Sequence, residues 1–135
     1  MTKYLLDTNI CIAFLKNNET VIKKIRTVGL ENLFLCSPVK AELWYGACKS
    51  ERITANQLLL KEFFLQFQSV PFDDKAVTHY GENRAFLSKQ GTPIGANDLL
   101  IAAIALSYHL VLVTHNTREF IRISNLLVED WLTES

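Results

Sequence analysis

Three acidic residues stand where a carboxylate can take part in chemistry. Asp7 directly ends the apolar run Tyr4-Leu5-Leu6, and Glu42 falls in the first turns of a segment with helical spacing. Asp98 is the single charge at the start of a segment whose next eight residues carry no polar side chain. Burying a lone carboxylate without a partner is costly, so we expect Asp98 to face an opening at the start of its helix. Gathered together, the three carboxylates would repel one another unless a cation neutralised them.

The chemistry expected of such a cluster is that of a hard divalent cation. Oxygen ligands without His or Cys select Mg²⁺, for which Mn²⁺ can substitute. Such a site commonly serves to hydrolyse phosphodiesters, because the cation activates water and stabilises the leaving oxygen. The same residue types also cap helices, so Asp7, Thr8 or Asn9 could serve only the helix that follows.

The elements that must position these residues alternate along the chain. Strand-like apolar runs cover residues 3–6, 32–36, 69–72, 110–113 and 126–128. Helical patterns cover residues 10–15, 19–28, 38–49, 53–67, 73–90 and 96–106, with a short turn or helix at 117–121. This alternation predicts a doubly wound α/β layer with a mostly parallel sheet. Because ligands bind at the carboxyl ends of parallel strands, the three carboxylates should meet at one edge.

Composition restricts the remaining classes of protein. We expect one domain over residues 1–135, because a chain of 135 residues is too short to suggest two. Fourteen basic and fourteen acidic residues leave no net charge to attract nucleic acid, so a polyanion would need a local patch. No apolar run approaches the roughly 20 residues that span a bilayer, so a cytoplasmic protein is expected. We interpret Cys11, Cys36 and Cys48 as reduced core thiols.

Five segments in order give the chain a family resemblance. They are Tyr-Leu-Leu-Asp-Thr-Asn at 4–9, Ala-Glu-Leu-Trp-Tyr-Gly-Ala at 41–47, Gly-x-Pro-Ile-Gly-x-x-Asp-x-x-Ile-Ala at 91–102, Leu-Val-Thr-x-Asn-Thr-Arg-Glu-Phe at 112–120 and Val-Glu-Asp-Trp at 128–131. Over nearly its whole length the chain resembles the PIN-domain nucleases, and among them the VapC-type toxins of bacterial toxin–antitoxin pairs. The resemblance implies a five-stranded sheet flanked by helices on both faces and a Mg²⁺ site at Asp7, Glu42 and Asp98.

The activity implied by the resemblance is that of an endoribonuclease toxin that inhibits translation. Close relatives cut initiator tRNA in the anticodon loop and others cut ribosomal RNA, so tRNA is the expected substrate. The resemblance also implies a cognate VapB antitoxin. The phenylalanine-rich segment 53–67 supports a partner, because its apolar face exceeds what a small sheet can cover. We therefore expect the antitoxin and a second toxin copy to bury part of it, in a homodimer that assembles into a larger complex.

The chain departs from the family pattern at Asn116. Many members carry a fourth Asp there, whereas Asn116 offers a metal only a neutral amide oxygen. We predict that Glu119 takes its place, in the first turn of a short helix capped by Thr117, and that it points towards Asp98. The alternative is that Glu119 only pairs with Arg122 on the surface.

Several further residues are candidates for supporting the site or contacting RNA. Thr114 ends a strand and could hold a metal-bound water, while Arg118 suits an RNA phosphate. Tyr45 could stack on a base, although an aromatic side chain in a small domain more often serves the core or an interface. Asn9 and Lys49 complete this group.

Two other classes of protein remain open. A haloacid-dehalogenase phosphatase also begins with Asp after its first strand, but it needs a second Asp where this chain has Asn9. A catalytically silent binding module would use the carboxylates only as helix caps.

Overall fold

The structure, a computed structural model, describes residues 1–133 and contains a five-stranded sheet in the order β3-β2-β1-β4-β5. All four strand pairings are parallel, which confirms the predicted sheet. The strands are β1 (Tyr4–Leu6), β2 (Leu33–Cys36), β3 (Gln68–Val70), β4 (Val111–Val113) and β5 (Val128–Glu129).

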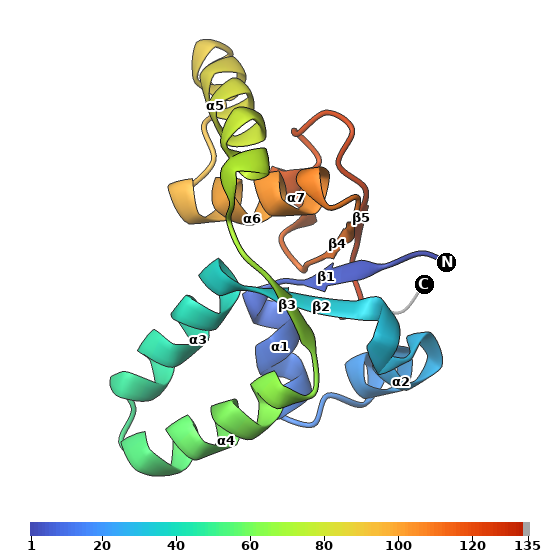
Figure 1. Cartoon of the computed structure of the whole chain (residues 1–135), viewed down its shortest axis with the longest axis vertical. Coiled ribbons are helices and arrows are strands. Elements are labelled where there is room, and N and C mark those ends of the chain that lie inside the picture. The colour runs from blue at the N-terminus through green and yellow to red at the C-terminus, as the bar shows by residue number, and fades with distance from the viewer. Residues whose placement is uncertain (134–135) are drawn as a thin grey trace.

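Helices cover both faces of this sheet, as predicted (Figure 1). They are α1 (Thr8–Leu15), α2 (Glu19–Val28), α3 (Ser37–Cys48), α4 (Ile53–Leu65), α5 (Asp74–Lys89), α6 (Ala96–Ser107) and α7 (Thr117–Phe120), with a 3₁₀ turn at Leu30–Asn32. Helices α1 to α4 lie on one side, where α3 and α4 form a projecting pair, and α5 to α7 lie on the other (Figure 1). None of the helices within residues 1–133 is long and apolar enough to cross a membrane.

Strand β1 lies at the centre of the sheet and fixes the position of the residues that follow it. Its Tyr4 is in register with Leu33 of β2 on one side and with Val111 of β4 on the other. Every residue of β2 and β4 is buried, as expected for parallel strands covered on both faces. The chain segments after β1 and β4 therefore emerge side by side at the carboxyl edge of the sheet.

Helix α6 is the central helix that its apolar sequence predicts. Leu99 and the run Ile101–Ala105 are buried, and α6 packs against α5 and α3. The contact with α3 matters for the site, because it brings the beginning of α6 to the helix that carries Glu42.

Some predicted positions in the fold are wrong. Helical spacing predicts that Val77, Phe86 and Leu87 of α5 face inward, but Val77 and Phe86 are 53% and 49% exposed. Helix α5 covers mainly α6, so its buried face is narrow and consists of Leu87, as predicted, and of Ala76. Cys48 is exposed at the end of α3, whereas Cys11 and Cys36 are buried as predicted.

Two apolar segments also differ from prediction in detail. Strand β3 is an edge strand and ends at Val70, whereas the predicted strand extends to residue 72; Pro71, which has no N–H to donate, lies just beyond it. In α4 the predicted apolar face is split, because Phe63 is buried while Leu58 and Leu59 are 58% and 47% exposed. The exposed leucines leave an apolar surface on α4 for another chain to cover.

Candidate active site

Asp7 both caps α1 and faces the carboxyl edge of the sheet, so its two interpretations are compatible. Its backbone is extended, and its N–H donates to the carbonyl of Val113 at 2.9 Å. One carboxylate oxygen accepts the Thr8 N–H at 2.8 Å, and the other accepts the Thr114 hydroxyl at 2.7 Å. The side chain is only 5% exposed, and this burial raises the pKa of Asp7. The site therefore contains a rigidly held, desolvated carboxylate.

Thr114 holds Asp7 in place from the end of β4. It is fully buried, and its hydroxyl donates to Asp7 while accepting the Asn116 N–H at 3.0 Å. Its own N–H donates to the carbonyl of Glu129 at 2.9 Å. Thr114 thus positions the Asp7 carboxylate. Its predicted role of holding a metal-bound water stays a prediction.

Asp98 lies in the first turn of α6 and interacts with all the other candidate carboxylates. Burial of this half-buried group raises its pKa to about 6, and the negative charges of Asp7, Glu119 and Glu42 add to the shift. A hydrogen bond with Glu119 raises the pKa further. The structure thus brings together the carboxylates predicted from strand ends and helix starts.

Glu42 approaches the cluster from α3 but is itself exposed to solvent. Its Oε1 accepts a hydrogen bond from the side-chain amide of Asn97, which precedes Asp98 in α6. Asn97 was not among the residues predicted for the site. Its position beside Asp98 in the first turn of a helix was the available signal.

Glu119 lies beside Asp98 as predicted, with Asn116 as its immediate partner. The Asn116 amide donates to Glu119 Oε2 at 3.1 Å. The predicted cap at Thr117 is wrong, because Asn116 occupies the N-cap position and Thr117 is already helical. Within residues 1–133 Glu119 forms no ion pair with Arg122. The part of Glu119 in a metal site stays a prediction.

The supporting candidates lie around the cluster. Asn9 links α1 to the segment after β4, because its Oδ1 accepts the His115 N–H at 3.3 Å. Tyr45 lies on α3 three residues beyond Glu42, and Lys49 is the residue that directly follows α3. The ammonium of Lys49 is 4.7 Å from the Tyr45 ring centroid. Arg118 is exposed on α7. RNA contacts by Tyr45, Lys49 and Arg118 stay predictions.

The donor set suits a hard divalent cation. It consists of carboxylate oxygens, and the pKa of Asp98 is raised first by burial and then by the neighbouring negative charges, whose repulsion a cation would relieve. Within residues 1–133 no three His, Cys, Asp or Glu side chains already converge on one point. Glu42 and Glu119 instead each accept an amide hydrogen bond at one carboxylate oxygen, from Asn97 and Asn116 respectively. The residues fit a metal in charge and chemistry, in an open arrangement.

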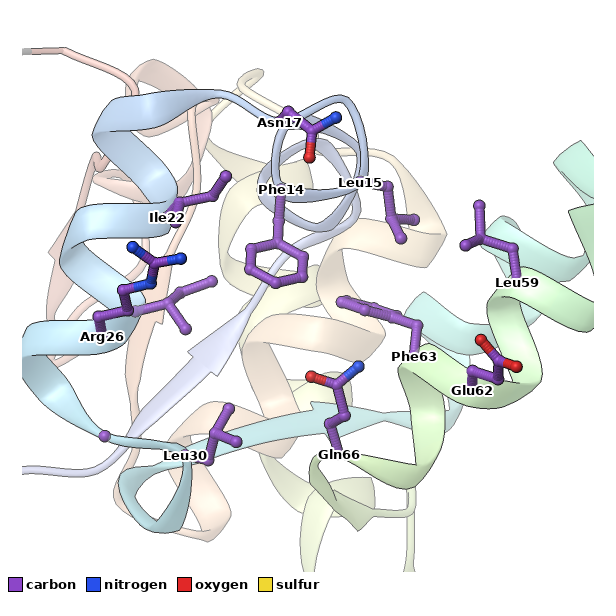
Figure 2. Close-up of a pocket in the computed structure, with 12 residues that line it drawn as sticks. Phe14, Leu15, Asn17, Ile22, Arg26, Leu30, Leu59, Glu62, Phe63 and Gln66 are labelled. Carbon is purple, nitrogen blue, oxygen red and sulfur yellow. The ribbon is translucent and has the colours of Figure 1, made fainter.

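A separate apolar pocket of about 570 Å³ lies between α1, α2 and α4 (Figure 2). The rings of Phe14 and Phe63 lie next to each other in this pocket, and Arg26 and Glu62 stand at its opposite sides (Figure 2). None of the site carboxylates lines it. A neighbouring pocket of about 350 Å³ does connect to the site, because Glu42 and the exposed Leu59 both line it.

We compared the sequence and the fold of the chain with those of known proteins to identify the class to which it belongs. The PIN domain matches residues 4–126, so the chain belongs to the PIN domain family. The tRNA(fMet)-specific endonuclease VapC of Shigella flexneri is 39% identical, over 97% of this chain and 99% of that protein. Ribonuclease VapC2 of Rickettsia felis is 38% identical, over 95% of this chain and 97% of that protein.

The solved structures give the same result. The DNA-bound VapBC crystal structure from Salmonella typhimurium superposes with a TM-score of 0.90 at 36% identity, covering 97% of this chain and 99% of that one. Within the PIN domain family the chain is thus a VapC-type protein.

Proposed function

We propose that this chain is the ribonuclease toxin of a type II toxin–antitoxin pair and that it hydrolyses RNA phosphodiester bonds with Mg²⁺. The observation that carries the proposal is the cluster of Asp7, Glu42, Asp98 and Glu119, in which burial, and then the charges of the other three carboxylates, raise the pKa of Asp98 to about 6. Full-length similarity to proteins named as ribonucleases supports RNA as the substrate. The name of the Shigella flexneri relative favours tRNA, and initiator tRNA in particular.

The four carboxylates would have different roles in binding the cation. Bound between the carboxylates, Mg²⁺ would lower the pKa of water and neutralise charge on the phosphodiester. Asp7 would be the fixed ligand, because the Thr8 N–H and the Thr114 hydroxyl hold both of its oxygens. Glu42 and Glu119 would be the adaptable ligands, since each could exchange an amide hydrogen bond for the cation. Asp98 would complete the site as a carboxylate, the form that a cation favours.

Alternative functions fit the site less well. A capping role explains Asp7 but not Asp98, because the side chains at the start of α6 make no capping hydrogen bond. A phosphatase of the haloacid-dehalogenase kind needs a carboxylate at Asn9, where the chain instead has an amide that accepts the His115 N–H.

Cleavage of total cellular RNA tests the proposed activity. We expect the purified protein to cut a small set of RNAs, tRNA among them, in the presence of Mg²⁺ or Mn²⁺. Asp7→Asn keeps the size of the side chain and removes a charge, so the cuts should disappear, and excess EDTA should have the same effect. Cleavage by the parent protein that persists in EDTA would refute the proposed chemistry.

We further propose that an apolar segment of a VapB-type antitoxin docks on the surface formed by α1, α2 and α4. Toxin–antitoxin complexes from Salmonella typhimurium and nontypeable Haemophilus influenzae are close structural neighbours of this chain, with TM-scores of 0.90 and 0.88. The pocket between these helices and the exposed Leu58 and Leu59 provide an apolar surface. From there an antitoxin arginine could pair with the site carboxylates.

Titration with the product of the adjacent small gene tests this partner. We expect Leu59→Asp to weaken binding at least about 10-fold, because a charge would enter an apolar contact. Ile121→Asp is the matched control, since Ile121 is 76% exposed and lies just after α7, on the other side of the sheet. Equal weakening by both variants would contradict this docking surface. We also propose that the toxin forms a homodimer, and a protein that stays monomeric at high micromolar concentration would overturn that part.

A further inference from the structure

His115 occupies a position in the site that the proposed metal chemistry does not use. It follows Thr114, which holds Asp7, and it precedes Asn116, which holds Glu119. Its N–H donates to Asn9 Oδ1 at 3.3 Å, and its ring Nδ1 lies 3.0 Å from Asp130 Oδ2. The imidazole is therefore attached to the rim of the carboxylate cluster by both its backbone and its ring.

Asp130 is held in a fixed orientation by the segment after β5. Its second oxygen, Oδ1, accepts the Leu132 N–H at 2.9 Å, and its side chain is only 15% exposed. The following Trp131 is 2% exposed, and its indole N–H donates to Glu129 at 3.0 Å. A carboxylate fixed in this way sets the orientation and the proton position of the imidazole that it contacts.

The consequence is an oriented hydrogen-bond acceptor beside the cluster. With the ring proton on Nδ1 facing Asp130, Nε2 carries a lone pair, and no atom of residues 1–133 hydrogen-bonds to it. The side chain is 57% exposed, so Nε2 is available to a ligand. A hydrogen bond between exposed side chains contributes little to stability, so the contact between His115 and Asp130 is not explained by folding alone.

The chemistry of a neutral acceptor selects one group of an RNA strand. A phosphate has no proton to donate, whereas every ribose offers its 2′-hydroxyl, which deoxyribose lacks. We propose that Nε2 of His115, oriented by Asp130, accepts a hydrogen bond from a ribose 2′-hydroxyl near the bond that is cut. His115 is then a substrate-contacting residue that selects RNA over DNA, and Asp130 is its positioning residue. This inference rests on the proposed ribonuclease function.

Single 2′-deoxy substitutions in an oligonucleotide spanning the mapped cleavage site test this contact. For the parent protein, we expect one substitution to lower kcat/KM about 5- to 10-fold, the usual effect of losing a neutral hydrogen bond. His115→Phe keeps a ring without nitrogen, and it should lower kcat/KM on all-ribose RNA by the same factor. The deoxy substitution should then cause no further loss in this variant.

The controls separate this role from a structural one. Asp130→Asn should lower kcat/KM on all-ribose RNA and reduce sensitivity to the same 2′-deoxy position, because the imidazole proton is no longer fixed. His79→Ala, a change on α5, should keep the full sensitivity of the parent. If His115→Phe and His115→Ala remained as sensitive as the parent, the contact would be refuted while the ribonuclease function stood. A parent protein that cut no RNA would overturn the proposed function and this inference together.

Discussion

Replacement of Asp98 by Asn in the metal-free protein measures how much the Asp98 carboxylate changes the free energy of unfolding. The pKa of Asp98 rises from 3.8 to about 6 on folding, mainly through burial and then through neighbouring carboxylates. Two pKa units correspond to at most about 3 kcal/mol. Because the group is half-buried and solvent screens it, we expect an effect of about 1 kcal/mol on the free energy of unfolding.

The sign of the effect follows from which state binds the proton more tightly. The folded state holds the Asp98 proton up to about pH 6, whereas the unfolded chain releases it near pH 4. This residue therefore makes the parent protein lose stability as the pH rises from about 4 to 6, and the loss persists above pH 6. Asn cannot ionise, so Asp98→Asn should be about 1 kcal/mol more stable than the parent at pH 7.5 and closer to it at pH 4.5.

Urea unfolding in EDTA at pH 4.5 and at pH 7.5 measures both differences. Glu51→Gln is the control, because Glu51 is exposed and lies outside the carboxylate cluster. Addition of Mg²⁺ at pH 7.5 should stabilise the parent and not Asp98→Asn, since only the parent keeps the full set of ligands. A variant that was less stable than the parent at pH 7.5, with an unchanged pH dependence, would refute this account of the site.

Three further variants test individual contacts. Thr114→Val leaves Asp7 without its hydroxyl donor and the Asn116 N–H without its acceptor. We therefore expect the free energy of unfolding in urea to fall by about 1–3 kcal/mol and most RNA cleavage to be lost. Thr114→Ser should restore both stability and cleavage, and a Thr114→Val protein that kept its activity would contradict the positioning role. Glu119→Gln should raise the Mg²⁺ concentration for half-maximal cleavage more than Asn116→Ala does, and identical titrations would show that Glu119 has no part in the metal site. Asn97→Ala removes the amide that binds Glu42, so the midpoint of thermal unfolding should change little while cleavage should need less Mg²⁺. If the variant needed more Mg²⁺ than the parent, Asn97 would instead position Glu42 for the metal.

The sequence predicts the main acidic residues because their positions relative to the strands determine the edge of the sheet at which they lie. Asp7 ends the central strand, Asp98 begins an apolar helix, and Glu42 follows a buried strand. In a parallel sheet all three positions belong to the carboxyl edge. Glu119 was found for a related reason, because it falls in the first turn of the helix that follows β4.

The polar partners of these carboxylates were not predictable in the same way. The Asn97 contact joins residues 55 apart in the chain, and the His115 contact joins residues 15 apart. Neither separation produces a periodic pattern. The buried face of α5 was predicted wrongly because apolar residues occur around much of the helix surface. Only the contact with α6 determines which of them are buried.

The central position of β1 has a consequence for biosynthesis. The first strand to leave the ribosome must pair with β4, and Asp7 must wait for the hydroxyl of Thr114, which is synthesised 107 residues later. Until then the emerging polypeptide has its first acidic residue but neither the β1–β4 pairing nor a complete cluster. A polypeptide that stopped before β4 would therefore lack both the hydroxyl that holds Asp7 and the carboxylate of Glu119.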